Sequence, residues 1–375
     1  MGSVLLAVRE MRRAKGRFGL LTGAVGILVF LVVFQQALLD GLVTEFVGAI
    51  RNQSADVLVY GADARLNLQG SVVGAGTEAE VAAVEGVAAA GPLGVATVTV
   101  QAGGELRDAT LIGHALGGPG QPARLAAGRR PASYGEAIAN VGDGDEGFGI
   151  GRRVVVQPGG RTVEIVGTAR EVAFSVTPTL FTSYATYEAV RISTNPDARG
   201  VLPSAIAVTV DEGAAPTEVA RRIEDQVAGV EAARARSAEE APGVASVSQS
   251  FGVILLLAYV VAVIVIGFFF LILTVQKRAT LTLLRAVGVP AARLVGALAA
   301  QVAAVLAGGI AVGTTLAALA LASPGSGIDA RVEPAALATT TVALLALAAV
   351  GCAAAARRIV RLDPAAATLP GAGAR

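Results

Sequence analysis

The sequence contains one cysteine, one histidine and no tryptophan in 375 residues. A single cysteine, Cys352, excludes an internal disulfide and a metal site built from cysteines. A single histidine, His114, argues against a zinc site with several histidine ligands in one chain. Lysine occurs only at positions 15 and 277, so nearly every basic residue is arginine. With the abundant alanine and glycine, this bias is typical of a GC-rich bacterial genome.

Several nucleotide, metal and catalytic motifs are also missing. No G-x-x-x-x-G-K-[S/T] phosphate loop occurs, so we expect no ATP binding by this chain alone. The acidic residues of the stretch 143–147 do not match the spacing of a calcium-binding EF-hand loop, and an exposed acidic turn is favoured there. His114 is either an axial ligand for haem iron or a surface or hydrogen-bonded histidine, and we favour the second. No nucleophile–base pair is recognisable, so the sequence predicts neither an enzyme nor a bound cofactor.

Charge is scarce and apolar runs are long. Charged residues make up 16% of the chain, hydrophobic residues make up 54%, and the mean hydropathy is +0.64. A helix needs about 20 apolar residues to cross a bilayer. Four runs without a charged residue satisfy that length, at 18–39, 251–275, 294–322 and 334–356. The predicted fold class is an α-helical membrane protein with four transmembrane helices and one mixed α/β extracytoplasmic domain.

The first apolar run follows a basic segment, residues 1–17, that could be mistaken for the start of a signal peptide. The run is too long for a signal peptide and no cleavage pattern follows closely, so we interpret it as a retained anchor. Gly19 with Gly23, and Gly309 with Gly313, form small-xxx-small pairs that favour close helix packing. The alternative is that glycine is simply frequent in this chain.

The basic residues set the orientation. Residues 1–17, 276–293 and 357–375 together hold 13 Lys and Arg but two acids, whereas residues 40–250 and the short loop 323–333 hold 17 Arg and 27 acids. Positively charged flanks stay on the cytosolic side. We therefore expect a multi-pass protein of the bacterial cell membrane with both termini in the cytosol.

Residues 40–250 carry the pattern of an α/β domain. Residues 55–60 are expected to form a strand. Thr77 and Glu80 are expected to form a capping box at the start of a short helix. Residues 94–101 and 106–113 are expected to form a hairpin around two glycines. Residues 115–135 are expected to form a surface loop, and 153–157 with 162–167 a second hairpin. The segments 205–210, 216–227 and 230–235 predict a strand–helix–strand unit that resembles half a ferredoxin-like module. A cap at 237–240 is expected to open a helix that continues into the second span, so that stalk helices couple the domain to the membrane.

The cytosolic segment 276–293 is mildly amphipathic. Leu281, Leu284 and Val287 have helical spacing, and residues 288–290 end the predicted helix. A short helix held between two spans is suited to receive force from a cytosolic partner.

The order of these elements resembles the MacB/FtsX/LolC-type ABC transporter permeases, and three motifs support this resemblance. Residues 283–289 (LLRAVGV) are similar to the family's R-A-[L/V]-G coupling segment. Residues 151–156 and 163–167 resemble its outer-domain hairpin, although Arg152 stands where the family has aspartate. Residues 358–365 resemble its basic tail and P-x-x-A turn. The first span and the size of the outer domain look most like the DevC/HrtB branch.

The resemblance implies a permease subunit that dimerises with a second copy or a similar subunit and binds two cytosolic ABC ATPase subunits. It implies that the coupling helix transmits ATP-driven motion to the outer domain, and it implies no nucleic-acid partner. The coupling residues on this sequence are Leu284, Arg285, Ala286, Val287 and Gly288.

An amphipathic or apolar substrate is expected to enter from the membrane or the outer face, and haem is the first specific candidate. The alternatives are export of a lipid, lipoprotein or peptide, or an FtsX-like activation of cell-wall hydrolases without transport. The residues suited to line such a pathway also suit lipid contact or helix packing; they are Phe30, Phe34, Gln35, Gln36 and Tyr259.

Overall fold

The computed structural model describes residues 15–195, 200–235, 242–276 and 290–322, with short stretches and single positions between 334 and 353. The chain divides into two compact units. The helical unit comprises Met1–Leu39 and Ser250–Arg375, and the sheet unit comprises Asp40–Gln249. Most of the predicted coupling segment, the 323–333 loop and the cytosolic tail lie outside the described residues, as does the predicted cap at 237–240.

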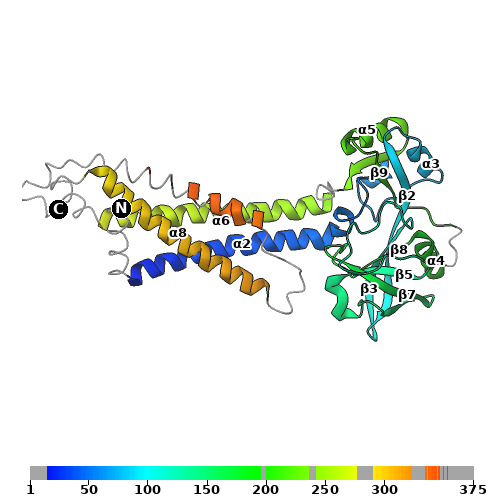
Figure 1. Cartoon of the computed structure of the whole chain (residues 1–375), viewed down its shortest axis with the longest axis horizontal. Helices are drawn as coiled ribbons and strands as arrows, with labels where there is room; N and C mark the ends of the chain where they lie inside the picture. The colour runs from blue at the N-terminus through cyan, green and yellow to red at the C-terminus, as the bar shows by residue number, and fades with distance from the viewer. Residues whose placement is uncertain are drawn as a thin grey trace, which may run out of the picture. The chain divides into compact units, whose positions relative to one another are not determined.

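Three long helices dominate the helical unit (Figure 1). They are α2 (Lys15–Arg51), α6 (Pro242–Gln276) and α8 (Ala291–Leu321), and the first two extend beyond this unit along the chain. Their mutual core is apolar and contains the following buried side chains: Phe18, Val25, Val29, Val33, Ala262, Val302, Val305, Leu306 and Ala317.

The sheet unit is built on a ten-stranded mixed sheet in the order β10-β1-β9-β2-β3-β8-β5-β7-β4, with β6 paired to β2 and β7. The strands are β1 (Val57–Gly61), β2 (Val87–Ala102), β3 (Glu105–His114), β4 (Ala127–Gly128), β5 (Glu136–Asn140), β6 (Arg153–Gln157), β7 (Arg161–Ala169), β8 (Thr179–Ser183), β9 (Ala205–Val210) and β10 (Val230–Arg234). The α-helices are α3 (Thr77–Ala82), α4 (Tyr184–Thr194) and α5 (Pro216–Gln226), and the 3-10 helices are η1 (Ala62–Ala64) and η2 (Val141–Glu146).

Both predicted hairpins are confirmed. Ala102 pairs with Glu105 across the Gly103–Gly104 turn between β2 and β3, and Val156 pairs with Arg161 between β6 and β7. The paired glycines supply the positive φ angles that such turns require.

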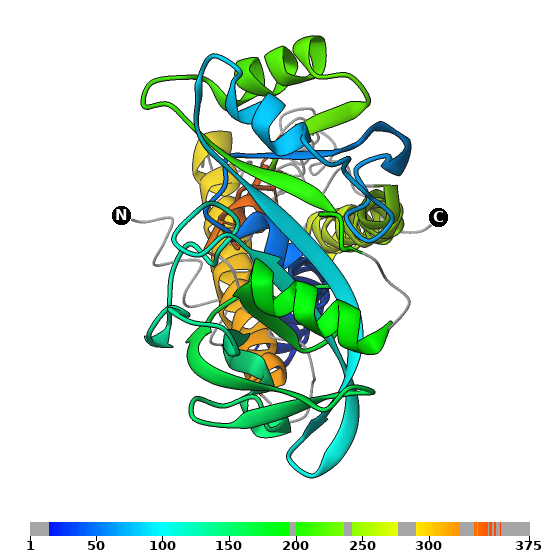
Figure 2. The ribbon, with the colours of Figure 1, turned by 90° about the vertical axis from the view of Figure 1, so that its right-hand side faces the viewer.

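The strand–helix–strand unit formed by β9, α5 and β10 is also found, but β1 lies between the two strands and pairs antiparallel with each. Pro216 occupies the first turn of α5, where its missing N–H costs nothing. Val219 and Ile223 lie on the inner face of α5 and are fully buried, and burial of each side chain stabilises the fold by about 1.5–3 kcal/mol. Figure 2 shows α3 and α5 over one part of the sheet and α4 over the other.

Two other predictions are corrected. Helix α3 begins at Thr77, but its N-cap is Gly76 with φ +94°, and no side chain caps it. The predicted capping box of Thr77 and Glu80 is therefore wrong, because Thr77 is already inside the helix. The 115–135 segment is not wholly loop, since β4 pairs with β7 through Ala127 and Gly128.

A tyrosine–glycine contact fixes α4 on the sheet. Gly94 and Gly113 face each other across β2 and β3, and the ring of Tyr187 lies directly against both. A β-carbon at either glycine would overlap the ring. The Tyr187 hydroxyl also donates to the carbonyl oxygen of Val95 at 3.3 Å.

Candidate functional site

The end of α2 is held by backbone hydrogen bonds within the sheet unit. The amide of Ala49 donates to the carbonyl of Ala173 at 2.9 Å. In the opposite sense, the amides of Ser175 and Val176 donate to the carbonyls of Phe46 and Glu45 at 3.1 and 3.0 Å. These carbonyls lie in the last two turns of the helix, so the sheet unit bonds the backbone of α2 before the helix ends. We call residues 171–176 the α2 clamp.

The clamp is a strained segment. Glu171, Ser175 and Val176 have φ angles of 57°, 55° and 58°, which non-glycine residues adopt at a cost of about 1–3 kcal/mol each. The Asn52 side chain donates to the Glu171 carbonyl at 2.7 Å, and Gly48 lets the α2 backbone approach the same carbonyl. Strain of this kind persists only where surrounding contacts overdetermine it.

Helix α2 is continuous across the division of the chain into units. Its residues up to Leu39 belong to the helical unit, and those from Asp40 to Arg51 belong to the sheet unit. The predicted first span, 18–39, therefore continues as a stalk of 12 more helical residues, as expected. Arg51 in the last turn donates to Thr44 at 3.2 Å and lies 4.0 Å from Asp40, a favourable place for a cation.

A ring of three polar side chains joins three segments of the helical unit. The Thr340 hydroxyl donates to Gln36 Oε1 at 3.0 Å, Gln36 Nε2 donates to the Tyr259 hydroxyl at 3.4 Å, and the Tyr259 and Thr340 oxygens are 3.4 Å apart. The Thr340 hydroxyl hydrogen is already donated to Gln36, so in the third contact Tyr259 donates to Thr340. Each of the three side chains then donates one hydrogen bond and accepts one, as polar groups in apolar surroundings require.

Glycines bring α2 and α8 into backbone contact. A β-carbon at Gly309 would lie 2.5 Å from Val25, and one at Gly313 would lie 2.5 Å from the carbonyl oxygen of Gly26. The predicted packing role of Gly309 and Gly313 is confirmed. Around Gly19 and Gly23, by contrast, the structure has nothing within 4 Å of the corresponding position, so the other predicted pair makes no such contact with the described residues.

The predicted substrate-lining residues are only partly brought together. Phe30 and Phe34 stack with ring centroids 5.4 Å apart, and Gln35 donates to the Phe251 carbonyl at 3.4 Å. Gln36 meets Tyr259 in the polar ring. Thr340 completes that ring and was missed, because a threonine in an apolar run carries no signal of its own. The predicted coupling residues, Leu284 to Gly288, lie outside the described residues.

His114 is hydrogen-bonded, as favoured from the sequence, with Nδ1 2.9 Å from the Ala115 carbonyl, and its side chain is buried at 1% exposure. Burial lowers its pKa, and an axial haem ligand would need an accessible ring nitrogen. Asp143 is not an openly exposed acid, because burial raises its pKa to about 6 and its carboxylate accepts from the Thr179 amide at 3.3 Å.

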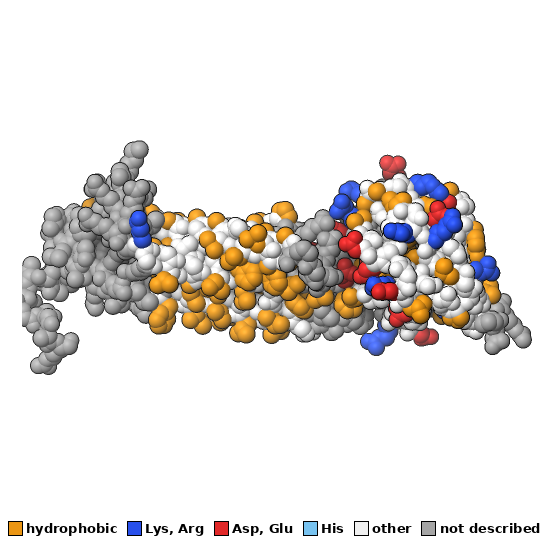
Figure 3. All heavy atoms as spheres, turned by 90° about the horizontal axis from the view of Figure 1, so that it is seen from below, with side chains coloured by type: hydrophobic (Ala, Val, Ile, Leu, Met, Phe, Trp, Pro, Cys, Tyr) orange, Lys and Arg blue, Asp and Glu red, His pale blue; other side chains and the backbone are white. Residues whose placement is uncertain are grey.

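Two described helical stretches are long and apolar enough to cross a membrane, Phe18–Arg51 and Ala299–Leu321. Within α6, Ser248–Ala262 is a shorter apolar stretch. The first and third predicted spans thus have matching helices, while the second and fourth stay predictions. In Figure 3 the face of the helical unit carries mainly hydrophobic and uncharged groups, whereas charged side chains gather on the sheet unit.

Residues 252–364 match the family model "FtsX-like permease C-terminal". Over nearly the whole chain, the sequence is 24% identical to an uncharacterized ABC transporter permease of Mycobacterium tuberculosis, in an alignment of 363 residues that covers 96% of this chain and 97% of that protein. A second uncharacterized ABC transporter permease of the same organism is 25% identical over 372 residues, with the same coverage. Residues 252–364 thus resemble an FtsX-like permease C-terminal domain, and the chain as a whole is similar to ABC transporter permeases.

The chain also has partial structural likenesses. The periplasmic region of MacB from Actinobacillus actinomycetemcomitans aligns with a TM-score of 0.38 and 10% identity, covering 50% of this chain and 92% of that one. The extracellular domain of the noncanonic ABC-type transporter YknZ from Gram-positive bacteria aligns with a TM-score of 0.32 and 16% identity, covering 48% of this chain and all of that one. TM-scores this low do not establish a shared fold.

Proposed function

We propose that this permease transmits the motion of cytosolic ABC ATPase subunits through the membrane to its sheet unit, and thereby extrudes or extracts an amphipathic or apolar substrate. The observation that carries the proposal is the continuity of α2 from residue 15 to residue 51, with its end held by the α2 clamp. A continuous helix transmits axial displacement and rotation, whereas a flexible linker would absorb them.

In the proposed complex, two permease subunits, identical or similar, bind two ATPase subunits. The segment 284–288 contacts the ATPases, both termini are cytosolic, and residues 40–250 lie outside the cell membrane. ATP is hydrolysed by the partner subunit, so the permease supplies binding and motion.

The decisive experiment breaks α2 between the units. Proline inside a helix removes a hydrogen bond and costs about 3 kcal/mol or more, so Leu42→Pro should kink the stalk. In nanodiscs with its ATPase, the variant should keep ATP hydrolysis but lose substrate transport. Leu42→Ala removes the same side chain without breaking the helix and should transport normally. Full transport by Leu42→Pro would contradict the proposal.

The coupling segment can be tested separately. Replacing Gly288 with valine should strain the end of the coupling helix by about 1 kcal/mol or more if its φ is positive. The ATPase should then lose its stimulation by the permease while expression persists. The alternative is that the positive charges of this segment only set the orientation of the protein in the membrane. In that case Arg285→Lys, which keeps the charge, and Gly288→Val would both leave activity intact.

Haem is the first substrate to test, because the stacked Phe30 and Phe34 rings suit a flat, apolar ligand. Purified permease should shift the Soret band saturably, and haem should stimulate ATP hydrolysis in the full complex. Absence of saturable binding, together with normal haem tolerance in a deletion strain, would remove haem and leave a lipid, lipoprotein or peptide substrate, or hydrolase activation.

A further inference from the structure

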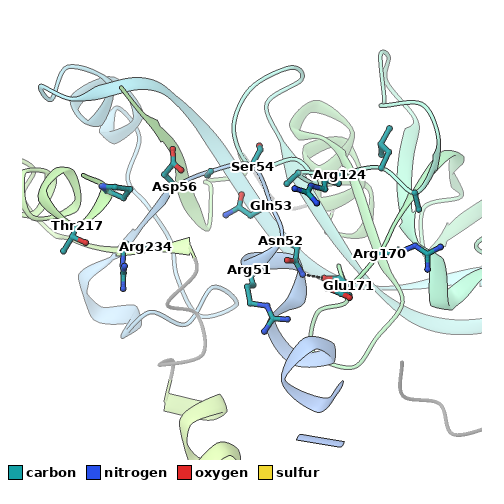
Figure 4. Close-up of a pocket in the computed structure, with 15 residues that line it drawn as sticks. Arg51, Asn52, Gln53, Ser54, Asp56, Arg124, Arg170, Glu171, Thr217 and Arg234 are labelled. Carbon is teal, nitrogen blue, oxygen red and sulfur yellow. Dashed lines mark hydrogen bonds between the residues drawn. The ribbon is translucent and has the colours of Figure 1, made fainter. Parts of the chain in front are cut away.

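The sheet unit contains an open pocket of about 1220 Å³ at the end of α2 (Figure 4). Its floor is the segment 51–56, and further walls come from residues 123–126, from Arg170 and Glu171, from the start of α5 and from Arg234. The walls are fixed by backbone hydrogen bonds: Ala123 N to Asn52 O at 2.9 Å, and Ser54 N to Gln121 O at 2.8 Å. The pocket is therefore preformed and large enough for a small ligand.

The lining is rich in arginine. Arg51, Arg124, Arg170 and Arg234 all line the pocket, against the two carboxylates of Asp56 and Glu171. Within the part of the chain that the structure describes, the guanidinium groups of Arg124, Arg170 and Arg234 have no hydrogen bond or ion pair.

One of the two opposing acids is already engaged. Asp56 Oδ2 accepts a hydrogen bond from the Val210 amide at 3.0 Å, which occupies part of its carboxylate. Arginine is the side chain best suited to bind phosphate or carboxylate groups through two parallel hydrogen bonds. The lining therefore favours an anionic ligand.

A buried amide in the same floor lacks partners. Gln53 is 7% exposed, and neither Nε2 nor Oε1 of its side chain has a hydrogen bond; the hydroxyl of Ser54 is also buried without one. A buried polar group without a hydrogen-bond partner destabilises the folded state. Gln53 lies among the pocket-lining side chains in Figure 4, so a ligand there could supply the missing partner.

The start of α5 adds a second favourable feature. Pro216 and Thr217, the first residues of this 11-residue helix, line the pocket. The N-terminus of a helix carries partial positive charge and free N–H groups that attract anions.

We propose that this pocket, which Arg124, Arg170 and Arg234 line from different sides, binds the anionic end of an amphiphilic ligand through a phosphate or carboxylate group, with Gln53 as a neutral partner. The assignment of this pocket as a capture site for cargo rests on the proposed function, whereas anion binding itself does not.

The test uses the full-length permease in nanodiscs of zwitterionic lipid, titrated calorimetrically with inorganic phosphate, dihexanoyl phosphatidic acid and dihexanoyl phosphatidylcholine. The triple variant R124Q/R170Q/R234Q should bind the two anionic probes at least tenfold more weakly than the unchanged protein. The control R65Q/R152Q/R161Q removes the same net charge from exposed arginines outside the pocket and should stay within about threefold, because distant surface charges are screened.

Two single variants sharpen the assignment. Glu171→Gln removes an opposing charge with little change of shape and should tighten anion binding. Gln53→Met removes the amide while keeping the volume, and should weaken binding and raise the melting temperature, because the unsatisfied group is gone.

Tighter binding of phosphatidic acid than of inorganic phosphate would support the proposal, because the acyl chains then contribute. Equal binding of the two would identify a site for a free anion and would overturn the amphiphilic part of the proposal. Absence of saturable binding, equal losses in both triple variants, or equally tight phosphatidylcholine binding would overturn the proposal. If anions fail to bind while Leu42→Pro still abolishes transport, the pocket assignment is wrong and the proposed function stands.

Discussion

A β-carbon at position 48 of α2 would lie 2.6 Å from the carbonyl oxygen of Glu171. The helix and the α2 clamp thus meet backbone to backbone, and this contact depends on a glycine in the last turn of the helix. Glycine within a helix normally weakens it by about 0.5–1 kcal/mol relative to alanine. The close approach explains why it is there.

Gly48→Ala should therefore reverse the usual effect of this substitution. The added methyl group has to displace the Glu171 backbone, which we expect to cost about 1–3 kcal/mol. Thermal unfolding of the full chain should shift downward, and amides at 173–176 should exchange faster with deuterium. Gly19→Ala lies in the same helix with open space around it and should be neutral or stabilising. If Gly48→Ala stabilised the protein, the Glu171 backbone would have to move aside from the new methyl group at little cost.

The contact between α2 and α8 should be equally sensitive to one methyl group. Gly313→Ala places a β-carbon 2.5 Å from the Gly26 carbonyl and should separate the helices, at a cost of about 1–3 kcal/mol. Resistance of the bilayer-reconstituted protein to unfolding by SDS measures this loss. Gly23→Ala is the matched control, because nothing lies within 4 Å of its new methyl group. Equal behaviour of the two variants would contradict the packing role.

The polar ring of Gln36, Tyr259 and Thr340 should be energetically coupled. Tyr259→Phe and Thr340→Val each remove one hydroxyl with little change of shape. Interhelical hydrogen bonds in membranes contribute about 0.6–2 kcal/mol, and the double variant should lose less than the sum of the single losses. A double-mutant cycle of unfolding free energies measures the coupling, and strict additivity would mean that the 3.4 Å contacts contribute nothing.

Asp143 should make the sheet unit less stable as pH rises. Its pKa in the folded state is raised from 3.8 to about 6, chiefly by burial, so between these values the folded state holds a proton that the unfolded state has released. Stability falls as pH rises through this window, and the full penalty applies above pH 6. Asp143→Asn removes the ionisable group, so it should raise the free energy of unfolding by about 1–3 kcal/mol at pH 7 and change it little at pH 4.

Melting temperatures of the full chain at the two pH values check this prediction. Asp145→Asn, an exposed neighbour in the same turn, is the control and should change neither value. A constant effect of Asp143→Asn across pH would show that the carboxyl group is solvated after all.

Local patterns predicted much of the sheet unit but not all of it. The β2–β3 hairpin was predictable because two glycines separate two alternating segments. Strands β5 and β8 were missed, since Ala137 to Asn140 and all five residues of β8 are buried and alternation is absent. The capping box failed because the sequence did not reveal that Gly76 would take the cap position.

The site residues divide in the same way. Gln36 and Tyr259 stood out as polar or aromatic residues in apolar runs, whereas Thr340 gained its role only from the three-dimensional arrangement. The pocket arginines are far apart in sequence and lie on different elements, and no spacing rule joins Arg124 to Arg234. The unsatisfied amide of Gln53 is a property of packing, which a sequence pattern does not record.

Strand β2 also determines how the sheet unit can deform. Its residues from Val87 to Leu93 pair with β9, while Leu93 to Ala102 pair with β3, so one 16-residue strand carries hydrogen bonds into both halves of the sheet. Rotation of one half against the other must appear as added twist of β2 near Leu93, where its pairing changes sides. Asp56 and Arg234 stand on the β9 side of this point and Arg170 on the β3 side. Twisting of β2 would therefore change the distance between the two sides of the arginine-lined pocket. The width of the pocket would then report how far the sheet has twisted.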